Sequence, residues 1–217
     1  LQDFGYLFIG PEKGEMACGE FGEGKMSSPR QIYAYLKNYF NKKNIVKKKN
    51  WKAIVTTGPT REYIDPVRYI SNKSSGKMGF SLAKAAMEES AIVQLITGPV
   101  NLETPERVSR INVESAQEMC EKVIESIPEI DLFISTAAVS DFKMKDIKKN
   151  KIKKEDSKSF NLELEKNEDI LKLVSKDNPE LKIVGFAAET ENLIDNAKKK
   201  LISKNLNLIV ANDVSDS

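Results

Sequence analysis

The segment 72–77 gathers polar groups that could bind an anion. It runs Asn-Lys-Ser-Ser-Gly-Lys and stands directly before an apolar run typical of a helix. Backbone N–H groups, hydroxyls and two ammonium groups would meet there, beside the positive end of a helix dipole. This combination favours an anion, above all a phosphate. The glycine spacings of a Walker loop and of Gly-x-Gly-x-x-Gly are both absent, so an ordered loop that only begins a helix is the alternative.

A long connection must position this segment. An apolar run at 52–57 predicts a buried strand, and the connection from there to a helix at 77–89 is too long for a tight turn. Two prolines and two glycines give the connection fixed bends, unlike the composition of a flexible linker. Connections of this length inside compact domains are uncommon and are usually functional.

Apolar and amphipathic runs alternate along the rest of the chain. The pattern predicts an α/β fold with a doubly wound, mostly parallel, Rossmann-like sheet, and a long substrate or nucleotide loop after its first strand. A capping box at 115–118 marks the start of one helix. The predicted strands are 52–57, 91–97, 110–113, 131–136, 160–164, 182–186 and 206–211, and the predicted helices are 77–89, 115–127, 169–175 and 193–204.

Polar or small residues follow most of these strands. Ligands of doubly wound sheets bind outside the carboxyl ends of the strands, so one crevice would collect these residues. Strand ends commonly lead into turn residues, which is the alternative explanation for each one taken singly. The residues are Thr57-Gly58, Thr97-Gly98, Ala137-Ala138 with Asp141, Ala187-Ala188-Glu189-Thr190 and Asn212-Asp213.

The first 50 residues have a different character. Residues 6–9 are a short strand candidate, and five glycines in 10–26 predict a flap without regular structure. Pro29 begins a helix whose apolar side carries Ile32, Tyr35, Leu36 and Tyr39. The lysine-rich run 41–50 is predicted to be a solvated linker and a domain boundary.

The composition narrows the possible functions. The 34 basic and 32 acidic residues give a net charge of +2, which does not favour a nucleic-acid-binding surface. No membrane-spanning stretch or signal peptide is evident, and two distant cysteines, Cys18 and Cys120, indicate a reducing cytoplasm. The chain has no histidine, so catalysis would use lysine, arginine, carboxylates, cysteine, amides or a bound metal whose ligands the sequence does not identify.

An NAD(P)-dependent oxidoreductase is one alternative for such a sheet. A dinucleotide site needs a glycine-rich first turn and an acidic residue at the end of the second strand, where it binds the ribose. Here the second predicted strand ends in Ile96-Thr97-Gly98-Pro99, without an acidic residue. The sequence therefore disfavours this alternative.

Several motifs, in one order from about Trp51 to the last residue, closely resemble the phosphopantothenoylcysteine synthetase domain of coenzyme A biosynthesis. Some are long, so the resemblance is specific. The motifs are residues 58–62 (Gly-Pro-Thr-Arg-Glu), 64–79, 137–141 (Ala-Ala-Val-Ser-Asp), 151–154 (Lys-Ile-Lys-Lys), 185–190 and 211–215 (Ala-Asn-Asp-Val-Ser).

Residues 16–26 resemble the end of the flavin-dependent phosphopantothenoylcysteine decarboxylase, which precedes the synthetase in bifunctional bacterial chains. This resemblance predicts a decarboxylase remnant at 1–40, a linker at 41–50 and a C-terminally incomplete synthetase domain at 51–217. The sequence begins with leucine, and we expect it to be a piece of a longer chain. Cys18 matches the decarboxylase proton donor, but FMN would bind only in the missing part, so no decarboxylation is expected.

The resemblance implies a ligase. Bacterial members activate 4′-phosphopantothenate with CTP and a divalent cation, Mg²⁺, to an acyl-cytidylate, and L-cysteine then displaces CMP. The partners would be these substrates and a second copy of the synthetase domain, with no nucleic acid and no membrane. A nucleotide-binding fragment that truncation has inactivated is a further alternative.

The resemblance also implies roles for individual residues. Lys151 would serve formation of the acyl-cytidylate, although its lysine-rich surroundings alone suggest a solvated loop. Asn72 would handle the acyl intermediate, with a helix cap as the alternative, and Arg68 would hold a phosphate or carboxylate. Ala137 and Ala138 would join Asn72 in binding the substrate.

The remaining assignments concern the nucleotide. Lys200 and Lys204 are one helical turn apart and could both face phosphates, or could form an ordinary solvated face. Glu168 departs from the usual proline of the family, which a backbone contact would tolerate. The full predicted nucleotide set is Gly58, Ser74, Ser75, Gly76, Lys77, Ser135, Thr136, Ala137, Asp141, Glu168, Asp169, Ile170, Leu171, Phe186, Lys200 and Lys204.

Overall fold

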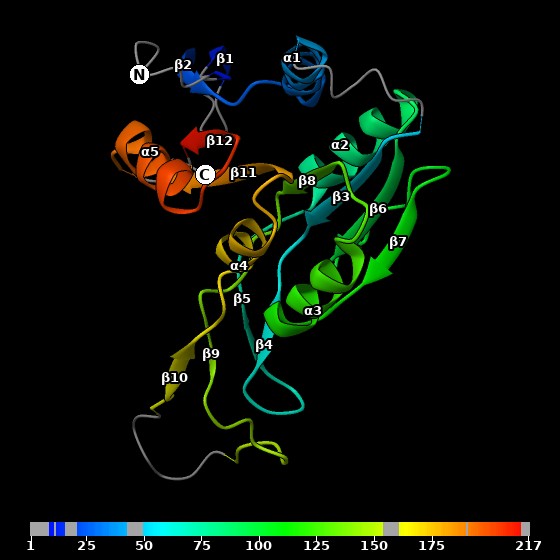
Figure 1. The fold of residues 1–217 in the computed structure, drawn as a ribbon. Helices are drawn as coiled ribbons and strands as arrows, with labels where there is room; N and C mark the ends of the chain where they lie inside the picture. The colour runs from blue at the N-terminus through cyan, green and yellow to red at the C-terminus, as the bar shows by residue number, and fades with distance from the viewer. Residues whose placement is uncertain are drawn as a thin grey trace.

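A six-stranded parallel sheet forms the centre of the computed structural model in Figure 1. The structure describes residues 9–10, 12–15, 21–42, 50–153, 161–189 and 191–213. The sheet order is β12-β11-β8-β3-β6-β7. Its strands are β3 (Lys52–Thr57), β6 (Ile92–Thr97), β7 (Ser109–Asn112), β8 (Leu132–Ser135), β11 (Lys182–Glu189) and β12 (Leu208–Asp213).

This strand order identifies the topology. Renumbered one to six along the chain, the strands lie in the order 6-5-4-1-2-3, which is the doubly wound dinucleotide-binding order viewed from its other edge. The order reverses between β3 and β8, and a ligand crevice is expected at such a point. The predicted doubly wound, Rossmann-like fold is confirmed.

Two hydrophobic clusters cover the two faces of the sheet. On β3, Ala53 and Val55 belong to one cluster and Ile54 to the other, because successive side chains of a strand point to opposite faces. Helices α1 and α2 pack on the first face, and α3, α4 and α5 on the second. The helices are α1 (Pro29–Lys42), α2 (Lys77–Glu88), α3 (Ala116–Ser126), α4 (Ile170–Asp177) and α5 (Leu193–Ser203).

The helix boundaries follow the predicted signals closely. Ser115 is the N-cap of α3, and its hydroxyl accepts a hydrogen bond from the Glu118 N–H at 3.1 Å. The Glu118 carboxylate accepts from the N–H of Glu114, at 2.9 Å, instead of the N–H of Ser115. The predicted capping box is therefore present, except that the Glu118 side chain binds the N–H one residue before the N-cap. No helix in the part of the chain that the structure describes is long and apolar enough to span a bilayer.

The prediction that 10–26 lacks regular structure is wrong. Strands β1 (Glu12–Glu15) and β2 (Phe21–Lys25) pair antiparallel, with Gly14 opposite Gly22. The Lys25 side chain passes over Gly14, where an added Cβ would lie 2.7 Å from Lys25 Cδ, a contact that the flexible lysine side chain can relieve by moving. Most of the strand candidate 6–9, Cys18 and Thr190 lie outside the described residues.

Helix α1 packs on the same core as the sheet. Ile32 and Leu36 are buried in the cluster that contains α2 and β3, and Tyr35 and Tyr39 pack against it. The helix continues to Lys42, two residues into the predicted linker, and residues 43–49 are outside the described part. The division of the chain into units at 1–40, 41–50 and 51–217 stays a prediction.

Two small hairpins project from the sheet at its lower end in Figure 1, and we call them together the arm. One hairpin, β4 (Arg61–Tyr63) with β5 (Tyr69–Ser71), lies within the long connection after β3. The other pairs β9 (Phe142–Met144) with β10 (Leu164–Lys166). The predicted strand at 160–164 is misplaced, because pairing with β9 begins only at Leu164 and extends to Lys166.

Candidate functional site

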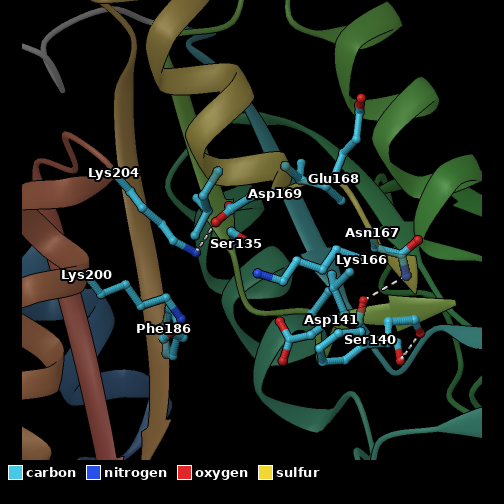
Figure 2. Close-up of a pocket in the computed structure, with 15 residues that line it drawn as sticks. Ser135, Ser140, Asp141, Lys166, Asn167, Glu168, Asp169, Phe186, Lys200 and Lys204 are labelled. Carbon is cyan, nitrogen blue, oxygen red and sulfur yellow. Dashed lines mark hydrogen bonds and ion pairs between the residues drawn. The ribbon is translucent and has the colours of Figure 1, made fainter. Parts of the chain in front are cut away.

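A cleft of about 460 Å³ lies at the carboxyl ends of β8 and β11 (Figure 2). It is lined by the loop after β8, the end of β10, the start of α4, Lys200 of α5 and Lys204 directly after α5. It collects most of the predicted nucleotide-binding residues, namely Ser135, Ala137, Asp141, Glu168, Asp169, Ile170, Leu171, Phe186, Lys200 and Lys204.

Lys200 on α5 and Lys204, the C-cap of this helix, supply positive charge to this cleft. The Lys200 ammonium donates to the Phe186 carbonyl at 2.7 Å, and Lys204 forms an ion pair with Asp169, also at 2.7 Å. Burial lowers the pKa of Lys200, and the positive charge of Lys204 lowers it further. Two ammonium groups held one turn apart in a partly enclosed cleft are suited to a polyphosphate.

Asp169 connects α4 to α5. One carboxylate oxygen accepts from the Lys172 N–H at 3.1 Å, which caps α4, and the other binds Lys204. Burial alone would raise the pKa of Asp169, but the hydrogen bonds from Lys204 and the Lys172 N–H, with the nearby lysine charges, hold it below its usual range. Asp169 is therefore ionised, and it is the present counter-ion of Lys204.

Sequence reasoning missed the residues that form the wall opposite α5. Lys166 is the last residue of β10, and Asn167 comes directly after it. Figure 2 shows the Lys166 ammonium directed into the cleft. The Asn167 amide donates to the Ser140 carbonyl at 2.9 Å, and its N–H donates to the Asp141 carbonyl at 2.9 Å. These bonds fasten the end of β10 to the loop after β8. Extending the strand predicted at 160–164 by two residues would have found Lys166.

Asp141 faces the same open space. Figure 2 shows its carboxylate pointing into the cleft from the loop after β8. Among the residues that the structure describes, this carboxylate has no hydrogen-bond or ion-pair partner, whereas the carboxylate of Asp169 has two. Glu168 also belongs to the lining, but Figure 2 shows its side chain directed away from the cleft, so Asp141 is the acidic group that faces a ligand there. The described residues include no group of three or more Cys, Asp or Glu that could hold a metal ion by themselves.

The predicted anion segment opens on a second cleft. Ser74, Ser75 and Lys77 line a cavity of about 620 Å³ near the ends of β6 and β7, on the other side of β3 from the first cleft. Two arginines of this cavity are already engaged. Arg110 donates to the Leu102 carbonyl at 2.7 Å, and Arg61 lies 3.6 Å from Glu114. The structure therefore separates Ser74, Ser75 and Lys77 from the predicted nucleotide residues that line the first cleft.

Close packing at the end of β3 explains the glycines between the two clefts. Gly58 and Gly76 both have φ of 73°, and the Gly76 carbonyl accepts from the Thr57 hydroxyl at 2.9 Å. A Cβ on Gly79 would lie 2.3 Å from Thr57 Cβ, so α2 starts directly against β3. Gly58, Gly76 and Thr136 line neither cleft, and the Thr136 hydroxyl donates to the Thr56 carbonyl at 2.7 Å.

Asn72 contacts the loop after β8. Its amide donates to the carbonyls of Ala138, at 3.3 Å, and Val139, at 3.0 Å. The structure thus brings Asn72 and Ala138 together, and their shared role in binding the substrate stays a prediction. The alternative that Asn72 caps α2 is wrong, because the N-cap is Gly76.

Arg68 and Lys151 lie on the arm and line neither cleft. The Arg68 guanidinium donates to the carbonyl of Ile152, the residue after Lys151, at 2.6 Å, and pairs with Asp65 at 2.7 Å. Lys151 itself is exposed. The Arg68 guanidinium therefore lies against the backbone next to Lys151. Both predicted catalytic residues lie outside the cleft that Lys200 and Lys204 line.

Comparison with known proteins gives consistent matches over most of the chain. Residues 48–217 match the sequence profile of the DNA/pantothenate metabolism flavoprotein C-terminal domain. The coenzyme A biosynthesis bifunctional protein CoaBC of Haemophilus influenzae is 49% identical over 216 residues, which cover 99% of this chain and 53% of that protein. The CoaBC protein of Bacillus subtilis is 44% identical over 215 residues, with 99% and 53% covered.

A solved structure supports the same relationship. The crystal structure of the C-terminal domain of a coenzyme A biosynthesis bifunctional protein CoaBC superposes with a TM-score of 0.66 and 42% identity, covering 74% of this chain and 76% of that one. The chain spans about half the length of the curated relatives it matches.

Proposed function

The chain belongs to the family of the DNA/pantothenate metabolism flavoprotein C-terminal domain, and from this premise we propose that it is a phosphopantothenate–cysteine ligase of coenzyme A biosynthesis. It activates the carboxylate of 4′-phosphopantothenate with CTP and releases pyrophosphate. The amine of L-cysteine then attacks the acyl-cytidylate, CMP leaves, and 4′-phosphopantothenoylcysteine is formed. The reaction takes place in the cytoplasm.

The cleft at the ends of β8 and β11 carries this proposal. Its volume of about 460 Å³ is within the range of small-ligand sites, and it lies beside the point where the strand order reverses. Lys200 and Lys204 bind the phosphates, Asp141 binds the nucleoside or the metal, Phe186 lies against the nucleotide, and the start of α4 contributes backbone groups. This site suits a nucleoside triphosphate better than an unphosphorylated ligand.

Magnesium fits the cleft as an ion that arrives with the triphosphate. Mg²⁺ is commonly held by one or two carboxylates together with substrate phosphates, and the Asp141 carboxylate is the available one. When bound, the ion neutralises charge on the phosphates during transfer. Asp169 remains with Lys204 and the α4 backbone.

The arm supplies the other residues. Lys151 offsets the charge that develops on the α-phosphate and the acyl oxygens, Asn72 orients the acyl group, and Arg68 holds a phosphate or carboxylate of the substrate. Asn72 is already bonded to the loop that carries Ala137 and Asp141, which supports one continuous site from the cleft towards the arm.

The chain acts as a homodimer through its synthetase domain. The arm leaves several large apolar side chains exposed, with Val67 at 59% and Ile147 at 62%, together with Tyr69, Phe142 and Leu164. Solvent-exposed apolar groups gathered on one projection favour contact with another protein surface. A second copy is the partner that the resemblance implies.

Pyrophosphate release tests the proposal. The chain is incubated with Mg²⁺, CTP and 4′-phosphopantothenate, with ATP in place of CTP as the comparison, before and after L-cysteine is added. Release that depends on phosphopantothenate, followed by CMP and the amide product, is expected. Lys151→Gln should abolish release, whereas Lys176→Gln, on the exposed side of α4, should not.

Other outcomes would identify the alternatives. CTP binding without pyrophosphate release would indicate a nucleotide-binding fragment without turnover. Binding of NAD(P) in preference to CTP would support the oxidoreductase instead, although β6 ends at Thr97-Gly98 without an acidic residue. Release of carbon dioxide from phosphopantothenoylcysteine with added FMN would contradict the expectation that this chain does not decarboxylate.

A further inference from the structure

Asp65 is a fully buried carboxylate at the turn between β4 and β5, with an exposed fraction of 0%. One of its oxygens accepts from the N–H groups of Val67 and Arg68, each at 2.9 Å. The other accepts from the Arg68 guanidinium, with Nε at 3.0 Å, and from the Ile152 N–H at 3.1 Å. A carboxylate without water around it is stable only when it is hydrogen-bonded in this way.

These bonds join two distant parts of the chain. Ile152 lies 87 residues after Asp65, and both of its backbone polar groups are taken. Its N–H donates to Asp65, and its carbonyl accepts from Arg68 at 2.6 Å. The N–H of Lys148 also donates to the Ile64 carbonyl at 3.0 Å. The turn at 64–68 therefore fixes the backbone on both sides of Lys151.

The Lys151 side chain has no such support. It is exposed, and among the described residues no hydrogen bond or ion pair holds its ammonium group. A lysine carries its charge at the end of a flexible four-carbon chain, so the location of that charge depends on how firmly the backbone is held. The bonds to Ile152 are the closest fixed points to it.

We propose that Asp65 is a positioning residue that holds Arg68 and the backbone of Lys151 in one arrangement. This inference rests on the proposed function, in which Lys151 serves acyl-cytidylate formation and Arg68 holds the substrate. Asp65 touches no substrate itself. It aligns the two cations through Ile152, so that both belong to one rigid part of the arm.

A carboxylate is required because its two oxygens must accept hydrogen bonds from four donor groups. Asparagine has one acceptor oxygen, and its amide NH₂ would face donors in either orientation: the Arg68 guanidinium with the Ile152 N–H, or the two N–H groups of Val67 and Arg68. Asp65→Asn keeps the size of the side chain but must release at least one of these partners. The low pKa of Asp65, about 2, agrees with this set of donors, since they outweigh the effect of burial, which would raise it.

Partial-reaction kinetics test the inference. Asp65→Asn should slow pyrophosphate release from CTP and phosphopantothenate by about 10- to 100-fold, while CTP affinity changes by no more than about twofold. The matched control is Glu165→Gln, which removes the 3.4 Å contact with Lys143 in the other hairpin of the arm and should leave the rate unchanged. A rate for Asp65→Asn within about twofold of the wild type would overturn the inference.

Amide hydrogen exchange, followed by NMR, gives a readout that does not need activity. In the wild type, the Ile152 N–H should exchange at least about tenfold more slowly than in a free peptide. Asp65→Asn should remove this protection but leave that of the Lys145 N–H, which donates to the Glu163 carbonyl at 3.1 Å. Equal loss at both amides would indicate general loosening of the arm and would overturn a specific positioning role.

The two tests distinguish failure of the proposed function from failure of the inference about Asp65. If the wild type releases no pyrophosphate, the proposed function fails, while exchange of the Ile152 amide still decides whether Asp65 holds this backbone. An unprotected Ile152 amide in the wild type would overturn the inference even if Asp65→Asn does not fold.

Discussion

The Lys204 ammonium lies 2.7 Å from the Asp169 carboxylate, which joins the end of α5 to the start of α4. The same carboxylate caps α4 through its other oxygen. The proposed phosphate site is therefore partly neutralised from within. A triphosphate must either replace Asp169 as the partner of Lys204 or bind beside it.

Asp169→Asn should strengthen CTP binding by about two- to fivefold. The substitution removes a negative charge from the phosphate side of the cleft and frees Lys204, and the effect is modest because both side chains are partly exposed to solvent. Asparagine is a good N-cap, so α4 should keep its start. Isothermal titration calorimetry with CTP at fixed ionic strength measures the change. Weaker binding would mean that Asp169 contributes to the nucleotide site directly.

Lys200→Gln should weaken CTP binding by about tenfold or more, because one charge-assisted hydrogen bond to phosphate is lost. The control is Lys198→Gln on the same helix, whose side chain is 3.8 Å from Asp195 at the surface. Burial lowers the pKa of Lys200 below the usual 10.5, so wild-type affinity should fall as the pH rises through this lowered value. Titrations at several pH values check this. Equal effects of the two substitutions would contradict a specific role of Lys200.

Asp65 should make the folded state sensitive to acid. Its pKa in the folded protein is about 2, compared with 3.8 ordinarily, so the ionised form stabilises the folded state at pH values above 3.8. This stabilisation should be lost progressively as the pH falls from 3.8 through about 2. Urea unfolding at several pH values in this range measures the free energy of unfolding. This free energy should change less with pH for Asp65→Asn than for the wild type. Asp146→Asn, at an exposed position of the same arm, is the control and should keep the wild-type slope.

Gly79→Ala should destabilise the protein by about 1–3 kcal/mol, the usual cost of inserting a methyl group into a filled space. The added Cβ would meet Thr57 Cβ at 2.3 Å and Thr136 Oγ1 at 2.6 Å, so α2 would have to move away from β3. Lys84→Ala, at an exposed position of α2, should change stability by less than about 0.5 kcal/mol. Thermal or urea unfolding compares the two variants. Similar stabilities would show that the start of α2 can shift without cost.

Ile147→Asp should shift the proposed homodimer towards monomer, because it places a charge among the exposed apolar groups of the arm. Sedimentation velocity over a range of protein concentrations measures the association. Ile202→Asp is the control, since Ile202 is equally exposed, at 63%, but lies on α5. A wild-type chain that sediments as a monomer at all concentrations would contradict the dimer.

The sequence predicted the central strands of the sheet well because they are buried on both faces and form short apolar runs between turn residues. The strand at 52–57 has the boundaries of β3. The β1–β2 hairpin was not predictable from local preference, because a glycine-rich run favours turns and these strands are defined by pairing with each other. The position of β10 likewise depends on its partner β9.

The candidate site was only partly predictable for a related reason. The rule that ligands bind at strand ends identified Ala137 and Asp141, but it does not say on which side of β3 a loop will open. Ser74 and Lys77 line the cleft near β6 and β7, whereas Lys200 and Lys204 line the one near β8 and β11. That separation follows from the order of strands in the sheet, which local sequence patterns do not contain. Lys166 was missed because its strand was placed too early.

The central position of β3 has a consequence for synthesis of the chain on the ribosome. β3 is the first strand of the main sheet to be made, yet the edge that receives β8 is not covered until 79 further residues have followed, as the Thr56–Ser135 pair shows. A nascent chain at that stage exposes an apolar strand edge, which is where aggregation begins. We expect folding to be slow because it depends on pairing between strands that are distant in the sequence. The yield of folded protein in cells should depend on chaperones and on the rate of translation between β3 and β8.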